Sequence, residues 1–212
     1  FITRLKKRQN SFSIRKRLGG TEKIKMKPSF LLESAEKYGS LDAELLVSEQ
    51  TIKQSVKKIA SKISDSLKDE QPIFVILMNG GLGLYGLLNQ YVNIYYEVNY
   101  IHPSRYDASI NGSELRWLKK PDNSFSNRTL LLIDDVFDKG VTLREAVKEC
   151  KKSGATKVFT AVLVEKQVTD REKTIDVDFT ALKLPDKFLI GAGMDYQGMF
   201  RNLKDIYALK LD

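Results

Sequence analysis

The sequence has one cysteine and one histidine, and it has no long hydrophobic run. A single cysteine, Cys150, excludes an intrachain disulfide and any zinc site built from cysteines alone. A single histidine, His102, argues against a His-rich metal site and a Ser–His–Asp triad, and we expect it to be structural. The longest apolar runs, Ile73–Met78 and Leu130–Ile133, are far shorter than the ~20 residues that a bilayer span requires. The sequence therefore predicts neither a disulfide scaffold nor a membrane-spanning segment.

The composition is that of an ordinary globular protein. The chain has 212 residues, of which 42% are hydrophobic and 29% are charged, so wholesale disorder is excluded. The net charge of +8 is unevenly distributed. Residues 1–27 contain ten Lys or Arg and one acid, which gives +9 and leaves −1 for residues 28–212. The basic character therefore belongs to an N-terminal arm, and residues 28–212 are expected to form a single domain.

The arm, residues 1–27, has three interpretations that the sequence leaves open. It is a tail that binds phosphates, a targeting peptide, or upstream sequence outside the working domain. Its Arg, Lys and Ser content with few acids is compatible with a transit peptide, and it has no h-region of a secretory signal. Met26 opens a stretch that reads as the start of a domain.

The pattern of apolar residues beyond the arm predicts an α/β protein. Ser48 precedes apolar residues spaced by three and four positions up to Leu67, which predicts a helix with Ser48 as its N-cap. Further helices are expected at 82–88 and 142–152, and strands at 73–78, 92–101, 114–118, 129–133 and 157–164. The strand–helix–strand unit around residues 129–164 implies a parallel pair, so we expect a mostly parallel sheet. Ligands bind such sheets beyond the carboxyl ends of their strands.

An acidic loop follows one of these strand ends. Asp134 and Asp135 leave the strand together, where paired carboxylates can accept hydrogen bonds from sugar hydroxyls or lie near a divalent cation. The following turn, 138–142, enters a helix N-terminus, which favours a phosphate, and Gly140 permits its close approach. The alternative is a solvated strand exit in which Asp138 caps the helix. The combination favours a ribose 5-phosphate.

Leu130–Thr142 resembles the 5-phosphoribosyl-1-pyrophosphate (PRPP) signature of the type I phosphoribosyltransferases, and most of all that of the hypoxanthine-guanine phosphoribosyltransferases. The likeness runs from about Leu45 to Tyr207. It implies a mostly parallel twisted sheet flanked by helices, with a small hood formed by N- and C-terminal segments. The core would span about 45–165, and the hood that binds the purine would come from 28–45 and 166–212.

The resemblance also implies roles for individual residues. Asp134 and Asp135 would bind the ribose. Asp138 would act as general base at the purine N7, and the 5-phosphate would be held by Asp138, Lys139, Gly140, Val141 and Thr142. Lys166, Phe188, Leu189 and Asp195 would bind the purine, with Lys166 on its 6-oxo group and Phe188 stacked on the ring. Asn79, Gly80 and Arg201 would bind the pyrophosphate. The implied cofactor is Mg²⁺, held by Asp195, Asp134 and Asp135.

Four positions depart from the pattern of the family, and one of them, Asp134, is a mild change, because Glu is common there. Asn79 stands where Lys is common, which removes a charge from the pyrophosphate loop, and Lys139 stands where Thr is common. A mobile catalytic lid is expected around Ser104, Arg105 and Tyr106, where the family commonly has Ser-Tyr in place of Arg105-Tyr106. Some bacterial members share the departures at Asn79 and in the lid, so these indicate a bacterial-like subgroup.

The sequence thus predicts a cytoplasmic purine-salvage enzyme that joins hypoxanthine or guanine to PRPP and forms IMP or GMP and pyrophosphate. Xanthine is a further candidate base. The expected assembly is a homodimer or homotetramer, without membrane or nucleic-acid partners. The alternative is a regulator that keeps the fold, senses PRPP and binds RNA or DNA through the basic arm.

Overall fold

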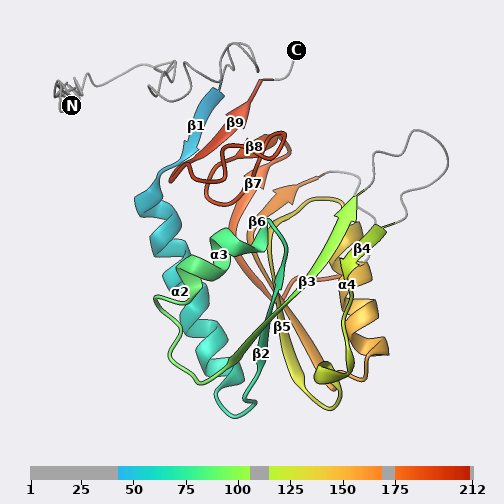
Figure 1. Ribbon diagram of the computed structural model, residues 1–212. Helices are drawn as coiled ribbons and strands as arrows, with labels where there is room; N and C mark the ends of the chain where they lie inside the picture. Colours follow the sequence, from blue (N-terminus) through green and yellow to red (C-terminus); the bar gives the residue numbers. More distant parts are fainter. Residues whose placement is uncertain (1–42, 106–114, 169–174, 211–212) are drawn as a thin grey trace, which may run out of the picture.

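The computed structural model describes residues 43–105, 115–168 and 175–210 of the chain, and its architecture is drawn in Figure 1. Three predicted features lie wholly or partly outside these residues. They are the basic arm at 1–27, the part of the hood assigned to residues 28–42, and the lid residue Tyr106.

A six-stranded sheet with the order β4-β3-β2-β5-β6-β7 forms the body of the molecule. Its strands are β2 (Ile73–Leu77), β3 (Glu97–Arg105), β4 (Leu115–Lys119), β5 (Thr129–Phe137), β6 (Lys157–Gln167) and β7 (Phe179–Pro185). All neighbours are parallel except β3 and β4, which are antiparallel. The predicted α/β class with a mostly parallel sheet is therefore confirmed.

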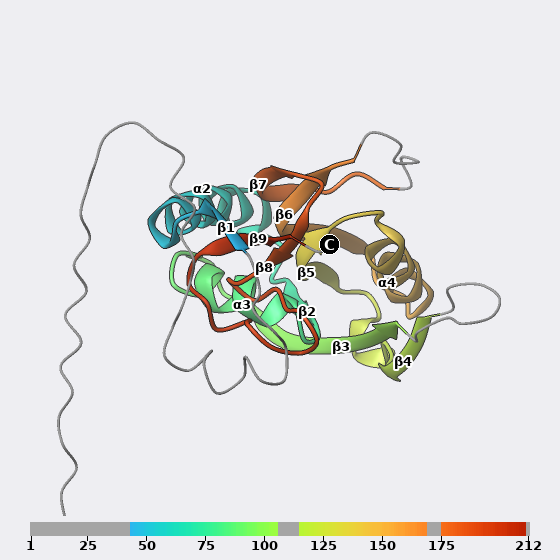
Figure 2. The same ribbon diagram turned by 90° about the horizontal axis from the view of Figure 1, so that it is seen from above.

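Helices cover both faces of this sheet. α2 (Glu49–Leu67) and α3 (Gly81–Leu88) lie on one face and α4 (Val141–Lys152) on the other (Figures 1 and 2). α2 begins as predicted, because the Ser48 side chain accepts a hydrogen bond from the N–H of Thr51. Within the described part of the chain, no helix has the length and apolar character needed to cross a membrane.

The two-sided cover explains the uninterrupted apolar run of β5. Leu131 and Ile133 pack in the core beneath α2, whereas Leu130 and Leu132 pack in the core beneath α4. All four side chains are fully buried. A central parallel strand needs apolar side chains on both faces, so it shows no alternation in the sequence.

A second, three-stranded antiparallel sheet lies above the carboxyl ends of the central strands (Figure 1). It consists of β1 (Ala43–Val47), β8 (Phe188–Ile190) and β9 (Ile206–Leu209), in the order β1-β9-β8. This sheet is the small hood of N- and C-terminal segments that the sequence predicts.

The hood is smaller than predicted at its C-terminal part, because β7 belongs to the main sheet. The resemblance assigns all of 166–212 to the hood, yet β7 pairs in parallel with β6 from Phe179 to Pro185. The core beneath α2 includes the buried ring of Phe179. α2 packs against β7, and this contact holds the segment on the main sheet.

Three strands end later than their apolar runs predict. β5 continues past Ile133 through Asp134 and Asp135, and β6 continues to Gln167. The sequence predicts a strand at 92–101, but β3 runs from Glu97 to Arg105, because its later residues pair with β4. Backbone pairing with a neighbour extends each strand into polar sequence that carries no strand signal.

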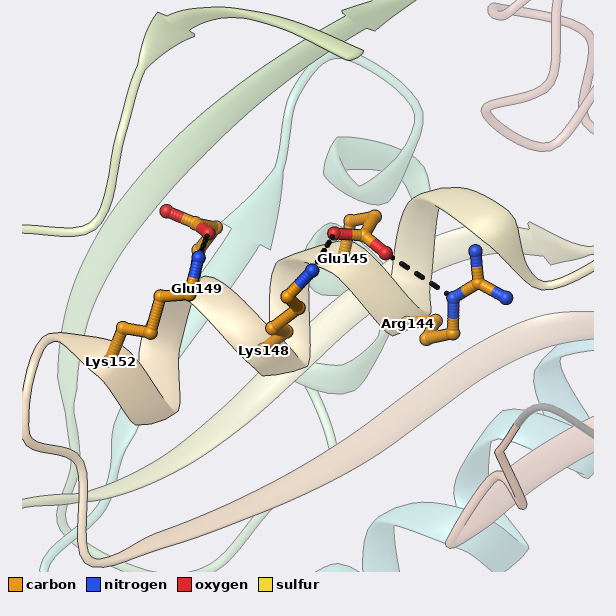
Figure 3. A network of polar contacts seen from close by, with 5 residues as sticks. All are labelled: Arg144, Glu145, Lys148, Glu149 and Lys152. Atoms are coloured by element: carbon orange, nitrogen blue, oxygen red, sulfur yellow. Dashed lines mark hydrogen bonds and ion pairs between the residues drawn. The ribbon is translucent and has the colours of Figure 1, made fainter. Parts of the chain in front are cut away.

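The exposed side of α4 is covered by ion pairs (Figure 3). Glu145 pairs with Lys148 at 3.2 Å and with Arg144 at 3.3 Å, and Glu149 pairs with Lys152 at 2.5 Å. The opposite side of the helix buries Leu143, Ala146 and Cys150. Because its apolar side is buried, α4 packs against β5 and β6, and this packing determines the position of its N-terminus.

Candidate active site

A cavity of about 660 Å³ opens at the carboxyl ends of the parallel strands, between the main sheet and the hood. Thirteen of the residues that the sequence assigns to the site line it: Asn79, Gly80, Ser104, Asp134, Asp135, Asp138, Gly140, Thr142, Lys166, Phe188, Leu189, Asp195 and Arg201. They come from distant segments of the chain, since Asn79 and Arg201 are 122 residues apart in the sequence. The structure therefore gathers most of the predicted site in one place.

Asp134 and Asp135 lie near the end of β5, within the strand rather than in the loop after it. Successive strand residues project to opposite faces, and Asp135 projects to the side of α3. The Asp134 carboxylate accepts a hydrogen bond from the Asp135 N–H at 2.9 Å. The two acids thus present their oxygens to the cavity from different sides of the strand.

Gly80 allows the loop after β2 to pass against Asp135. A Cβ added at Gly80 would lie 2.3 Å from Asp135 Oδ2, a distance that real contacts do not show. Any side chain at this position would force the carboxylate away. The predicted pyrophosphate loop at Asn79 and Gly80 therefore touches the predicted ribose site.

Arg201 joins two acids across the cavity. Its guanidinium lies 2.6 Å from Asp195 Oδ1 and 3.5 Å from Asp135 Oδ2, and it donates a hydrogen bond to the Gly193 carbonyl at 2.6 Å. Burial raises the pKa of the Asp135 carboxyl above its ordinary value, and the Arg201 charge opposes that shift. The cluster therefore contains a carboxylate that the ligand-free protein solvates poorly.

The turn between β5 and α4 has the geometry of an anion site. Gly140 has φ 76° as the N-cap residue of α4, a left-handed conformation that favours glycine. Gly140 has no side chain with which to cap this helix end, and the positive end of the helix dipole lies at the cavity, because Gly140 is one of its lining residues. Thr142 also lines the cavity, whereas Lys139 and Val141 are not among its lining residues.

Lys166 lies at the end of β6 between two carboxylates. Its Nζ is 3.4 Å from Asp138 Oδ2 and 3.2 Å from Asp186 Oδ1. The Lys166 side chain is 12% exposed, compared with 35% for Asp138. The ammonium is thus largely buried at the edge of the cavity, beside the acid that the sequence assigns to N7.

An aromatic wall closes the hood side of the cavity. The Phe188 ring is 41% exposed, although it lies in β8, and it contacts the Tyr196 ring edge-to-face with centroids 5.5 Å apart. The next residue, Leu189, is buried at 6% exposure, so its backbone lies fixed behind the ring. An exposed face of Phe188 is available for a planar ligand.

The cavity wall also includes residues to which the sequence assigns no role in the site. His102, expected to be purely structural, lines the cavity together with Pro103, Phe137 and Met194. His102 lies in β3, and the Met78 N–H donates to the carbonyl of the preceding residue, Ile101, at 3.0 Å. The parallel pairing of β2 with β3 places Leu77 opposite Ile101, and so brings His102 to the same end of the sheet as the loop at Asn79. The local sequence does not show which strands are neighbours. Of the predicted lid, Ser104 lines the cavity and Arg105 ends β3.

The carboxylates fit a metal that arrives with a phosphate ligand. Among the described residues, no group of three or more His, Cys, Asp or Glu could hold a metal ion alone. Mg²⁺ is commonly bound by one or two carboxylates together with substrate phosphates and waters. Asp135 and Asp195, linked through Arg201, offer such a donor set, and Asp134 lies beside them.

Comparisons with known proteins show which family the chain resembles. A family model described as "Phosphoribosyl transferase domain" matches residues 43–197. The hypoxanthine-guanine phosphoribosyltransferase of Bacillus subtilis is 29% identical over 168 residues, which cover 79% of this chain and 93% of the relative. The enzyme of the same name from Aquifex aeolicus is also 29% identical, over 79% of this chain and 94% of the relative.

Solved structures show the same fold. A crystal structure of a hypoxanthine phosphoribosyltransferase from Staphylococcus aureus superposes with a TM-score of 0.72 at 22% identity. The superposition covers 82% of this chain and 95% of that chain.

Proposed function

Because this chain belongs to the phosphoribosyl transferase domain family, we propose that it is a purine-salvage hypoxanthine-guanine phosphoribosyltransferase. It transfers the 5-phosphoribosyl group of PRPP to hypoxanthine or guanine and releases pyrophosphate, with IMP or GMP as the nucleotide product. The observation that supports this most strongly is the single cavity that contains the β5–α4 acidic loop, Lys166 and Phe188 together. The loop suits the ribose 5-phosphate of a nucleotide, the lysine donor suits the 6-oxo group of its base, and the aromatic ring suits the face of that base.

The base would bind on the hood side of the cavity. Phe188 offers its exposed face to the purine ring, and base–aromatic stacking contributes about 1–3 kcal/mol. The Lys166 ammonium donates hydrogen bonds and accepts none, so it suits a 6-oxo group and disfavours the 6-amino group of adenine. Asp138, next to Lys166, would take or hold the N7 proton as N9 attacks C1′ of the ribose.

PRPP would bind along β5 and the start of α4. Asp134 and Asp135 would accept hydrogen bonds from the ribose hydroxyls, and the N–H groups at the start of α4, around Gly140, Val141 and Thr142, would hold the 5-phosphate. Lys139 would add positive charge near this turn. The transition state should resemble an oxocarbenium ion at C1′, which the nearby carboxylates stabilise electrostatically.

The leaving pyrophosphate would lie between the loop at Asn79 and Gly80 and the guanidinium of Arg201. Backbone donors of that loop and Arg201 would neutralise the charge that develops on it. When Mg²⁺ is bound with the pyrophosphate, held by Asp195, Asp134 and Asp135, it supplies further charge stabilisation there. The lid around Ser104, Arg105 and Tyr106 would exclude water from the reacting centre.

The test is a Mg²⁺-dependent assay with PRPP and, separately, hypoxanthine, guanine, xanthine, adenine and uracil. Nucleotide formation from hypoxanthine or guanine, and not from adenine or uracil, is the expected result, and it ranks the 6-oxopurines. Binding of PRPP without turnover of any base would overturn the proposal. It would favour the PRPP-sensing regulator, whose sequence support, the basic arm at 1–27, lies outside the described residues.

We also propose that the enzyme works in the cytoplasm as a homodimer or homotetramer. PRPP is highly charged and does not cross an apolar bilayer unaided, so the enzyme is expected where PRPP is made. Three large apolar side chains of the outer strands β3 and β4 support the assembly: Val98, Tyr100 and Leu118 are 49%, 45% and 58% exposed. A cluster of exposed apolar residues is typical of a surface that contacts another chain.

A further inference from the structure

Asp186 has no role in the reaction proposed so far, although it contacts Lys166 directly. It lies in the turn between β7 and β8, where the Lys187 N–H donates to the Pro185 carbonyl at 2.9 Å. Its Oδ1 is 3.2 Å from the Lys166 ammonium, which is slightly closer than Asp138 Oδ2 at 3.4 Å. The Lys166 side chain is 12% exposed and that of Asp186 is 52% exposed, so the acid meets the buried ammonium from the solvent side.

Strand order explains why these three side chains meet. β5, β6 and β7 are consecutive neighbours in the sheet and run in the same direction. Phe137 pairs with Glu165, and Lys166 pairs with Leu184. The carboxyl ends of the three strands therefore place Asp138, Lys166 and Asp186 in one row, with the ammonium in the middle.

The proposed function assigns Asp138 to the N7 proton, and the chemistry of Asp186 gives that residue a different, indirect task. A carboxylate only accepts hydrogen bonds, and so does the 6-oxo oxygen of a purine, which means that Asp186 has no direct bond to offer that oxygen. Toward the 6-oxo group it acts through Lys166. An ammonium has three donors, so it can keep Asp186 as a partner while it donates to the base.

Removal of the Asp186 carboxylate would leave the Lys166 ammonium with a negative charge on the β5 side of this row only. The largely buried ammonium would keep Asp138 as a partner, and the attraction of that carboxylate, no longer opposed by Asp186, would draw it toward β5. That movement takes the ammonium away from the 6-position of the base. It also engages the carboxylate that the proposed function assigns to the N7 proton.

We propose that Asp186 is a positioning residue that holds the Lys166 ammonium at the 6-oxo edge of the purine and thereby sets the preference for 6-oxopurines. This inference rests on the proposed function. It adds a specificity-determining residue from outside the cavity wall, because Asp186 is not among the residues that line the cavity.

The test measures dissociation constants for IMP and for purine riboside 5′-monophosphate, which lacks the 6-oxo group. Asp186→Asn should lower the preference for IMP about threefold to fivefold, the effect of one partly exposed ion pair. Affinity for purine riboside 5′-monophosphate should change less than twofold. Glu44→Gln is the matched control, since Glu44 is 53% exposed and pairs with Lys187 at 3.0 Å, and it should leave the preference unchanged.

A second variant separates positioning from general damage to the fold. In a Lys166→Met background the preference for IMP should fall, and adding Asp186→Asn should then change it no further. Equal weakening of both nucleotides, an unchanged preference in Asp186→Asn, or a further loss in the Lys166→Met background would each overturn the role of Asp186. A wild-type protein that binds neither nucleotide would instead overturn the proposed function, and this inference with it.

Discussion

Asp138 is the residue with the most direct chemical task in the proposed reaction. It lies on the cavity wall beside Lys166, and its carboxylate is 35% exposed, so it is open to a ligand. A general base must reach the proton that it takes, and its loss reduces turnover more than binding.

Asp138→Asn should lower kcat by about 10²–10⁴-fold, because the amide has almost the same shape but is not a base. The dissociation constant for PRPP should change only slightly. Steady-state kinetics and PRPP binding by calorimetry check this, with Asp65→Asn on exposed α2 as the control. Parallel losses in turnover and PRPP affinity would show that Asp138 is a binding residue.

Asp135 has a proposed function in binding the ribose, but its buried carboxylate lowers the stability of the ligand-free protein. Burial raises the pKa of its carboxyl, so the ligand-free folded state binds this proton more tightly than the unfolded chain does. By linkage, its contribution to folding becomes less favourable as the pH rises through its unfolded and then its folded pKa.

Asp135→Asn should therefore stabilise the ligand-free protein at pH 7. The gain should shrink as the pH falls, and it should vanish below about pH 4, where the wild-type carboxyl is also neutral in the unfolded chain. Urea unfolding between pH 4 and pH 7 measures this, with Asp69→Asn as an exposed control. The same variant should lose most activity with PRPP. A gain that does not depend on pH would contradict the assigned cause.

At the scale of elements, α4 has ion pairs on its exposed side and contributes its N-terminus to the candidate site. Its N-terminus forms the predicted 5-phosphate turn, its apolar side packs on β5 and β6, and its exposed side has the ion pairs of Figure 3. Such pairs on one helix turn contribute little, whereas a side chain that caps a helix contributes more.

Glu145→Gln should lower the free energy of unfolding by no more than about 0.5 kcal/mol, and this loss should disappear in about 1 M salt. Ser48→Ala should cost about 1 kcal/mol, independent of salt, because it removes the acceptor for the Thr51 N–H at the start of α2. Denaturant unfolding of the two variants compares a surface ion pair with a helix cap. A larger effect at Glu145 than at Ser48 would contradict this ranking.

At the scale of the whole molecule, the two outer strands at one edge of the main sheet have three exposed apolar side chains, which we call the apolar patch. Val98, Tyr100 and Leu118 lie on β3 and β4, and Lys119 Nζ lies 3.9 Å above the centre of the Tyr100 ring. β3 continues from this patch to His102 and Ser104 on the cavity wall, so an assembly through the patch would adjoin the site.

Val98→Glu should reduce the molecular mass in solution toward that of one chain, because a charge in an apolar interface must be desolvated without a partner. Light scattering behind size-exclusion chromatography measures the mass. Lys57→Glu, on the exposed side of α2, should leave the assembly intact. An unchanged mass for Val98→Glu would exclude this patch from the interface.

The local sequence by itself determined the α/β class, the start of α2 at Ser48, and the acidic loop that enters α4, whereas the resemblance to a family supplied the other residues of the candidate site. Burial on both faces of β5 requires an apolar run, and the left-handed φ at the start of α4 favours Gly140, so both features can be recognised from adjacent residues of the sequence. Only the tertiary structure decided where β3, β5 and β6 end, that β7 joins the main sheet, that His102 lines the cavity and that Asp186 meets Lys166. In each of these cases the deciding hydrogen bond or ion pair comes from a segment distant in the chain, and periodicity within one segment contains no information about that partner.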